Sequence, residues 1–229
     1  MDTSGHINPY LKKVLGTIKL DKVFVYGKGN YLYDEEGICY LDFISSFGAM
    51  PFGFNHPEIW EVLEKIRREY IPSIVQTSDF RYQEKVAERL IDLAPEGLSY
   101  VVFTNSGTEA VEVAIRMAFL TTGRKRFIVT KGGYHGVQSE GFTYIPYGDI
   151  DALEKELMEN RDQYAGFIVE PIQGEGGIIL PPKGYLSKAV ELCNKYNVAF
   201  ILDEIQTGLG RTGFFFLCEE EGITPDILL

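Results

Sequence analysis

The chain has 229 residues, enough to bury one large domain or one domain and part of another, and its 45% hydrophobic and 24% charged content is ordinary for a globular protein. Its formal net charge of −11 argues against nucleic acid and anionic membranes as partners. No signal peptide is visible and no apolar run approaches the roughly 20 residues of a membrane span, so we expect a cytoplasmic protein.

The cysteines and histidines argue against two further kinds of site. Cys39, Cys193 and Cys218 are far apart and odd in number, which predicts free thiols in a reducing compartment rather than disulfides. The three histidines are scattered along the chain, so we expect no histidine metal site.

The N-terminal segment predicts a small antiparallel meander followed by a loop. Short strands are expected at 22–26, 31–34 and 39–43, with turns at 27–30 and 34–37. Residues 45–55 carry no clear hydrophobic period and read as a loop. Pro57 is placed to begin a helix that runs from Glu58 to about Tyr70.

A strand, a turn and a helix are expected in succession from Tyr100. The strand covers 100–103, the turn 104–107, and the helix runs from Thr108 to about Leu120, after an earlier helix at 79–93. Ser106 and Glu109 have the spacing of a capping box. Such a junction offers free N–H groups and the positive end of a helix to a phosphate, although this motif alone favours ordinary helix capping.

The remaining chain alternates strands with helices. Strands are expected at 126–130, 164–169 and 198–203, and helices at 151–160 and from Pro182 to about Tyr196. The last strand delivers Asp203 and Glu204 to a glycine-rich loop. Because chemistry in α/β proteins gathers beyond the carboxyl ends of strands, this loop is the first candidate site.

Two nucleotide interpretations of this loop are weak. A P-loop ATPase needs a G-x-x-x-x-G-K-[ST] string, and the chain contains none. Gly208, Gly210 and Gly213 match the dinucleotide fingerprint, but two carboxylates stand between the strand and the glycines, and their charge is wrong for a pyrophosphate.

A third interpretation is a family resemblance. The string LDEIQTGLGRTG at 202–213 resembles the signature of class III (omega-type) aminotransferases, which use pyridoxal phosphate (PLP). Similar stretches precede it in the expected order, and they include GNYLYDEEG, NHP, FTNSGTEA, KGGYHG and EPIQGEGG. The resemblance implies a fold-type I PLP transferase of the α/β class. Its mainly parallel, twisted sheet is flanked by helices and preceded by a small antiparallel segment, and the sequence stops before the catalytic lysine.

The same resemblance implies a domain division and a set of site residues. Residues 1–55 would be the N-terminal segment of the small domain, and 56–229 an incomplete PLP-binding large domain. The ring nitrogen would face Asp203, with Glu175 as a substrate switch and Phe47 near the substrate. The other cofactor-binding residues implied are the phosphate turn Ser106, Gly107 and Thr108, the ring wall Tyr134 with its neighbour His135, and Gln206 at the phenolic oxygen.

The sequence departs from the family pattern in two ways. Val137 stands where relatives that bind a substrate carboxylate often have arginine, and only 138–144 connects the aromatic turn to the next motif. The Schiff-base lysine is expected about three residues beyond Leu229 by the family's spacing. We therefore expect the 229-residue chain alone to be inactive.

The implied parent function is transfer of an amino group from an ω-amino acid or diamine to a keto acid such as 2-oxoglutarate, in a homodimer. The motif QGEGGIILPPxGYL is most similar to putrescine-type and ornithine-type members. Two alternatives stay open: an aminomutase or racemase on the same scaffold, and a non-catalytic binding module or fragment of this fold.

Overall fold

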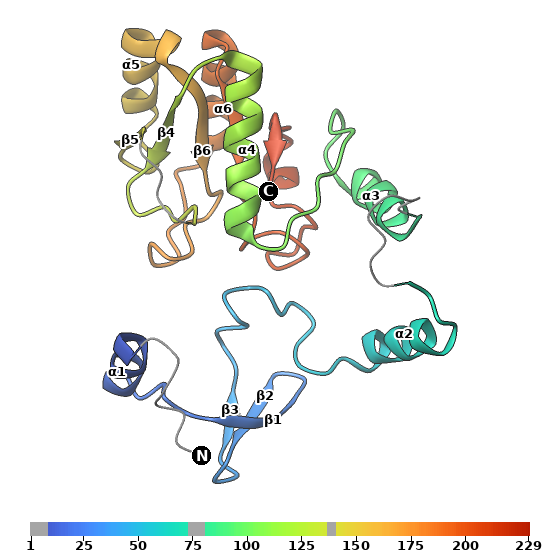
Figure 1. The fold of residues 1–229 in the computed structure, drawn as a ribbon. Helices are drawn as coiled ribbons and strands as arrows, with labels where there is room; N and C mark the ends of the chain where they lie inside the picture. Colours follow the sequence, from blue (N-terminus) through green and yellow to red (C-terminus); the bar gives the residue numbers. More distant parts are fainter. Residues whose placement is uncertain (1–8, 73–80, 137–140) are drawn as a thin grey trace. The chain divides into compact units, whose positions relative to one another are not determined.

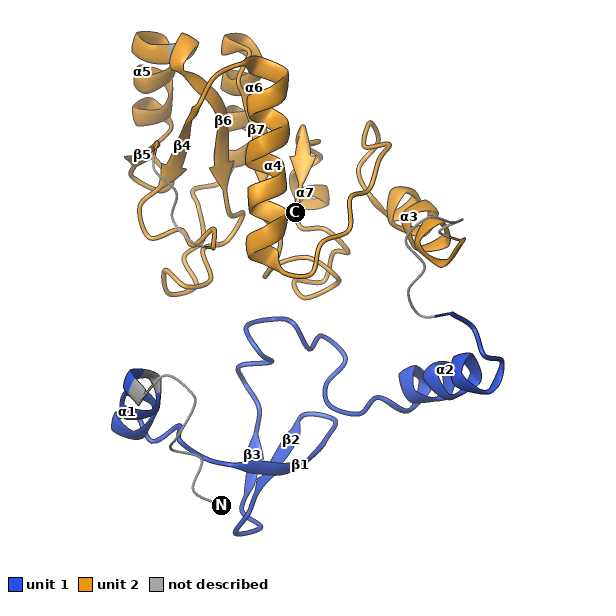
Figure 2. Ribbon diagram, viewed as in Figure 1, with its two compact units in different colours: residues 1–77 blue, residues 78–229 orange. Residues whose placement is uncertain are grey.

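The structure, a computed structural model, describes residues 9–72, 81–136 and 141–229. They fall into two compact units, residues 1–77 and 78–229, which Figure 2 shows in different colours. Among the described residues, no helix is long and apolar enough to cross a membrane.

The first unit contains the expected antiparallel meander. Its strands β1 (Phe24–Lys28), β2 (Tyr31–Asp34) and β3 (Cys39–Leu41) pair in that order. Asp34 closes the second turn, because its carboxylate accepts hydrogen bonds from the N–H groups of Glu36 and Ile38. Helix α1 (Pro9–Thr17), which the sequence did not predict, precedes the meander.

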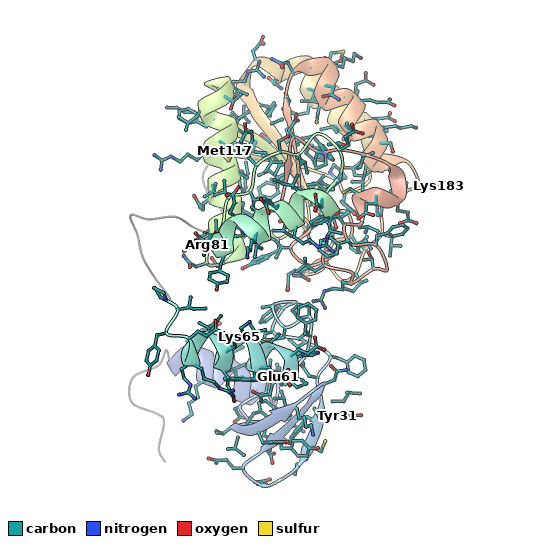
Figure 3. The ribbon with its side chains drawn as sticks, turned by 90° about the vertical axis from the view of Figure 1, so that its right-hand side faces the viewer. Tyr31, Glu61, Lys65, Arg81, Met117 and Lys183 are labelled. Carbon is teal, nitrogen blue, oxygen red and sulfur yellow. The ribbon has the colours of Figure 1, made fainter. Side chains whose placement is uncertain are left out.

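Helix α2 (Pro57–Arg68) also belongs to the first unit and begins at the expected proline. None of the side chains of α2 is buried, and Glu61 and Lys65 are labelled in Figure 3 as examples. The loop before it holds Ser45, Ser46 and Phe47 at positive φ, a conformation that belongs to turns rather than strands.

The second unit is built on one parallel sheet, with strand order β5-β4-β6-β7-β8 (Figure 1). Strands β4 and β6 match the sequence prediction, and β7 lies within it, but β5 was not predicted because it is short and follows residues of no clear pattern. The strands are β4 (Arg126–Thr130), β5 (Phe142–Ile145), β6 (Tyr164–Val169), β7 (Ala199–Leu202) and β8 (Ile227–Leu228).

Helices cover both faces of this sheet, as Figure 1 shows. Helix α4 (Gly107–Thr122) packs Ala114 and Ala118 against one face, which carries Val129 and Ile201. On the other face lie α5 (Ile150–Asn160) and α6 (Tyr185–Tyr196), whose apolar residues pack against alternate residues of the same strands. The 3₁₀ turn Arg161–Gln163 and helices α3 (Arg81–Leu93) and α7 (Cys218–Glu221) complete the unit.

The expected strand at 100–103 is wrong. These residues form no strand, and Tyr100 is 95% exposed, with Val102 and Phe103 also exposed. Their apolar, β-branched and aromatic composition suits a strand, but a strand also needs a hydrogen-bonded neighbour. No described residue pairs with this segment, and β8 has a partner only in β7.

Candidate functional site

The carboxyl ends of β4, β6 and β7 lie at one edge of the sheet. Val129 is in register with Ile168, and Val169 with Leu202, so the residues that follow these strands emerge side by side. The segments concerned are the aromatic turn (131–136), the β6 loop (170–177) and the β7 loop (203–213). The N-terminus of α4 reaches the same edge, because Gly107 lies against Ile205.

Asp203 and His135 form a buried pair at this edge. The carboxylate of Asp203 is 4% exposed, and its Oδ2 lies 2.7 Å from Nδ1 of His135. Since an ionised carboxylate only accepts hydrogen bonds, Nδ1 is the donor. The other oxygen, Oδ1, accepts the N–H of Ile205, while Nε2 of His135 is buried with no hydrogen-bond partner in the described part of the chain.

The aromatic turn is built by close backbone packing and presents Tyr134 to solvent. Tyr134 is 56% exposed, which leaves its ring available to a flat ligand. Gly136 has φ +76°, and a Cβ there would lie 2.8 Å from Oγ1 of Thr108. The turn thus touches the first turn of α4, and only glycine fits at the contact.

The N-terminus of α4 carries the predicted phosphate residues. Ser106 is the N-cap, and its Oγ accepts the N–H of Glu109, as the capping box predicts. Glu109 in turn accepts the N–H of Asn105 rather than that of Ser106. The N–H groups of Gly107 and Thr108 have no partner among the described residues, which leaves two donors at the positive end of a 16-residue helix.

The β6 and β7 loops also lie together. A Cβ on Gly174 would lie 2.2 Å from Oε1 of Gln206, so the absence of a side chain at Gly174 lets the two loops approach. Nε2 of Gln206 donates to Oε1 of Glu175 across 3.4 Å, a long hydrogen bond. The predicted switch residue and the predicted phenolic-oxygen partner are therefore neighbours.

Glu204 stabilises the β7 loop rather than facing the site. Its carboxylate is 2% exposed, with Oε2 accepting the N–H of Leu217 and Oγ1–H of Thr207 and Oε1 accepting the N–H of Cys218. The second carboxylate after β7 therefore supports loop geometry. Burial, together with the neighbouring Glu204 carboxylate, raises the pKa of the Cys218 thiol to about 12.

Glu170 is a site residue that the sequence reasoning missed. It directly follows the fully buried strand β6 and is itself 4% exposed, with its two oxygens bonded to the N–H groups of Tyr134 and Gly174. The available signal was its position: like Asp203, it is a carboxylate placed immediately after an apolar strand.

Two predicted features lie elsewhere. Phe47 belongs to the first unit and is exposed there, and Val137 lies outside the described residues, so the missing-arginine prediction is not tested. In the described ranges no cluster of three metal-ligating side chains occurs. The other predicted site residues lie together at the carboxyl edge of the sheet, and they include Asp203, His135, Ser106, Thr108, Tyr134 and Gln206.

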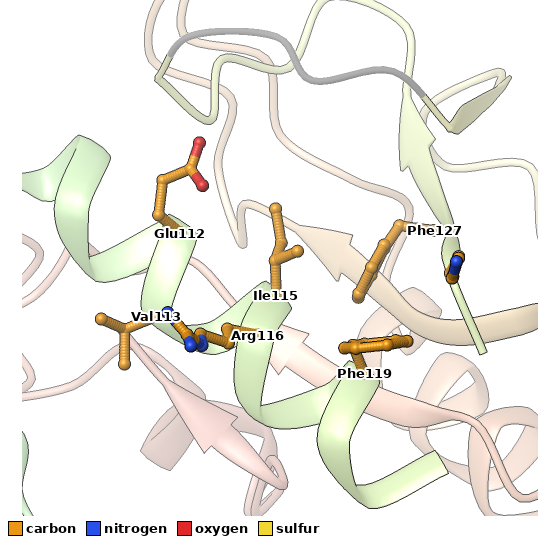
Figure 4. Close-up of a pocket in the computed structure, with 7 residues that line it drawn as sticks. Glu112, Val113, Ile115, Arg116, Phe119 and Phe127 are labelled. Carbon is orange, nitrogen blue, oxygen red and sulfur yellow. The ribbon is translucent and has the colours of Figure 1, made fainter. Parts of the chain in front are cut away.

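A groove of about 550 Å³ lies away from this edge, on α4 and the amino end of β4 (Figure 4). This groove contains none of the predicted site residues. Met117, which is also on α4 but does not line the groove, is exposed (Figure 3). The groove is lined by Glu112, Val113, Ile115, Arg116, Phe119, Lys125 and Phe127.

Comparison with known proteins gives matches along most of the chain. The family model "Aminotransferase class-III" matches residues 19–144 and 144–229, and the two stretches meet at the end of the short 138–144 connection. An acetylornithine aminotransferase from Methanopyrus kandleri is 37% identical in an alignment 224 residues long, which covers 88% of this chain and 56% of that protein. The chain thus spans about half the length of this curated relative.

Solved structures agree. The acetylornithine aminotransferase from Elizabethkingia anophelis matches with a TM-score of 0.79 and 34% identity over 96% of this chain and 58% of that one. The ornithine aminotransferase from Toxoplasma gondii matches with a TM-score of 0.81 and 30% identity over 90% of this chain and 54% of that one. PLP partly occupies the active site of the Toxoplasma structure.

Proposed function

The chain belongs to the class III aminotransferase family and has its fold-type I architecture, and from this premise we propose that it serves PLP-dependent transfer of an amino group. The observation that carries the proposal is the meeting of three loops at one sheet edge. His135 bonds Asp203, and Gly136 of the same turn lies against Thr108 at the start of α4.

The chemistry of these residues fits PLP. A pyridine nitrogen needs an anionic partner, and Asp203 is a buried carboxylate held by two hydrogen bonds. A phosphate needs donors, and the N-terminus of α4 offers two unpartnered N–H groups beside the Ser106 and Thr108 hydroxyls. A flat ring needs an aromatic wall, and Tyr134 presents an exposed one.

When bound, PLP supplies an electron sink for the charge that develops at the substrate carbon. We assign to Asp203 the task of holding a proton at the ring nitrogen. His135, bonded through Nδ1, keeps that carboxylate oriented. Gln206 would donate to the phenolic oxygen, and the first turn of α4 would anchor the phosphate.

For substrates, we propose an ω-amino acid or diamine as donor and a keto acid, 2-oxoglutarate, as acceptor. The named activities of the relatives, acetylornithine and ornithine aminotransferase, support a donor of this class. Glu175 would act as the substrate switch, and Phe47 would contribute near the substrate. We further propose a cytoplasmic homodimer, with 1–55 in the small domain and 56–229 in the large one.

The cofactor half of the proposal is tested by ligand binding. Calorimetry with pyridoxine 5′-phosphate, which has the ring and phosphate but no aldehyde to react with surface lysines, should show saturable one-site binding to the 229-residue chain. Absence of binding, or binding insensitive to Asp203→Asn, would contradict the assigned site.

The proposed amino-group transfer is tested on the natural protein that contains this sequence. With putrescine or ornithine as donor and 2-oxoglutarate as acceptor, glutamate should form, and Asp203→Asn should abolish it. The 229-residue chain, treated with pyridoxal 5′-phosphate and borohydride, should yield no stoichiometric adduct on one lysine. Cofactor binding without transfer in the natural protein would favour the non-catalytic alternative.

A further inference from the structure

Glu170 joins two loops of the site through one carboxylate. Its Oε1 accepts the N–H of Tyr134 at 2.8 Å, in the aromatic turn, and its Oε2 accepts the N–H of Gly174 at 2.9 Å, in the β6 loop. One oxygen serves each loop, so the rigid spacing of the two oxygens fixes the spacing of the loops. Hydrogen bonds to an ionised acceptor are the strong ones in proteins.

The backbone that carries this carboxylate is also fixed. The hydroxyl of Tyr147 donates to the carbonyl oxygens of Glu170 at 3.1 Å and Pro171 at 2.9 Å. Besides the bond from Tyr134 to Glu170, a second side chain links the β6 loop to the end of β4. Nε2 of Gln173 donates to Oγ1 of Thr130 and to the carbonyl of Lys131, each at 3.0 Å. The β6 loop is thus held to the end of β4 by two buried side chains.

Each loop carries a residue of the proposed site immediately beside the amide that Glu170 holds. Tyr134 is itself the proposed ring wall, and Gly174 precedes Glu175, which contacts Gln206. We propose that Glu170 is a positioning residue that clamps the aromatic turn to the β6 loop, so that Tyr134 and Glu175 are presented to cofactor and substrate as one unit. This inference rests on the proposed function, because the two loops serve catalysis only if those residues do.

The electrostatics make the clamp sensitive to protonation. Burial raises the pKa of Glu170 above its ordinary value, opposed by the hydrogen bonds from Gly174 and Tyr134 and by the charge of His135, while Asp203 adds to the increase. His135 and Asp203 are the titratable groups that act on it from the neighbouring loops. As pH falls through this raised pKa, the carboxyl gains a proton and loses acceptor strength toward both amides together.

The test compares Glu170→Gln with Glu204→Gln in the 229-residue chain. Glu204 is a similarly buried carboxylate in the β7 loop that also holds two backbone N–H groups, but neither belongs to Tyr134 or Gly174. A glutamine has one acceptor oxygen and an NH₂ group that cannot accept, so Glu170→Gln must lose at least one of the two bonds. Amide hydrogen exchange and proton shifts at Tyr134 and Gly174 are followed by NMR.

We expect exchange at one or both of these amides to rise about tenfold to a hundredfold in Glu170→Gln, relative to core amides of β6 and β7. Glu204→Gln should leave that ratio unchanged. A second measurement uses the unmutated chain and so does not depend on whether a variant folds. The NMR shifts of the amide protons of Tyr134 and Gly174 should titrate with one common midpoint, above the ordinary pKa of glutamate. The affinity for pyridoxine 5′-phosphate should fall about tenfold in Glu170→Gln.

Unchanged exchange in Glu170→Gln, a uniform rise at all amides in both variants, or separate midpoints for the two amides would each overturn the clamp. If the two amides respond as expected while the unmutated chain binds no pyridoxine 5′-phosphate, the clamp stands and the proposed function fails.

Discussion

Replacing Gly136 by alanine tests whether the aromatic turn and the phosphate turn form one site. Gly136 has φ +76°, and an added Cβ would lie 2.8, 2.9 and 3.0 Å from Oγ1, Cγ2 and Cβ of Thr108. Thr108 is β-branched and sits in the first turn of α4, so it cannot swing away as a long side chain would. The substitution must therefore displace the start of the helix or the turn.

The expected cost has two parts. Left-handed backbone costs alanine about 1–2 kcal/mol, and a methyl group forced into a packed contact costs about 1–3 kcal/mol more. Gly123→Ala is the matched control, because Gly123 has φ +71°, caps the other end of α4, and has open space where its Cβ would lie. The control should lose only the backbone part.

Urea unfolding followed by circular dichroism measures both variants, and calorimetry measures their affinity for pyridoxine 5′-phosphate. We expect Gly136→Ala to be less stable than Gly123→Ala by about 1–3 kcal/mol and to bind the ligand at least about tenfold more weakly, because Thr108 and its N–H have moved. Equal stability of the two variants would refute the packing argument. Unaltered affinity in Gly136→Ala would refute the assignment of Thr108 to the phosphate.

Three further predictions concern single residues. Ser106→Ala should lower stability by about 1 kcal/mol through loss of the N-cap and weaken pyridoxine 5′-phosphate binding; a change in stability alone would restrict Ser106 to capping. Asp203→Asn should weaken the same binding about tenfold or more while circular dichroism stays native, and affinity equal to that of the unmutated chain would remove Asp203 from the ring nitrogen. Because Val102 is exposed, Val102→Lys should change the free energy of unfolding in urea by less than about 0.5 kcal/mol, whereas a larger loss would mean that Val102 is packed.

Elements that depend on local pattern were predictable from the sequence. Strand β6 is an unbroken apolar run, and α4 has a capping serine before it and a glycine after it, so both were expected close to their observed positions. The 100–103 segment has an equally suitable composition and still forms no strand. Strand formation there depends on a neighbour, which is a property of the whole sheet and not of the segment.

The same contrast between local sequence and the arrangement of the whole sheet applies to the site residues. Asp203 and Glu170 each follow a buried apolar strand, and nothing in their local sequence says which one meets His135 and which one holds two amides. The difference comes from the parallel register, which sets the end of β6 between the ends of β4 and β7. A carboxylate on the central strand can reach the loops on its flanks, so Glu170 bonds the turn after β4 as well as its own loop. Asp203 follows the next strand, β7, and in the described part of the chain it bonds that turn through the side chain of His135.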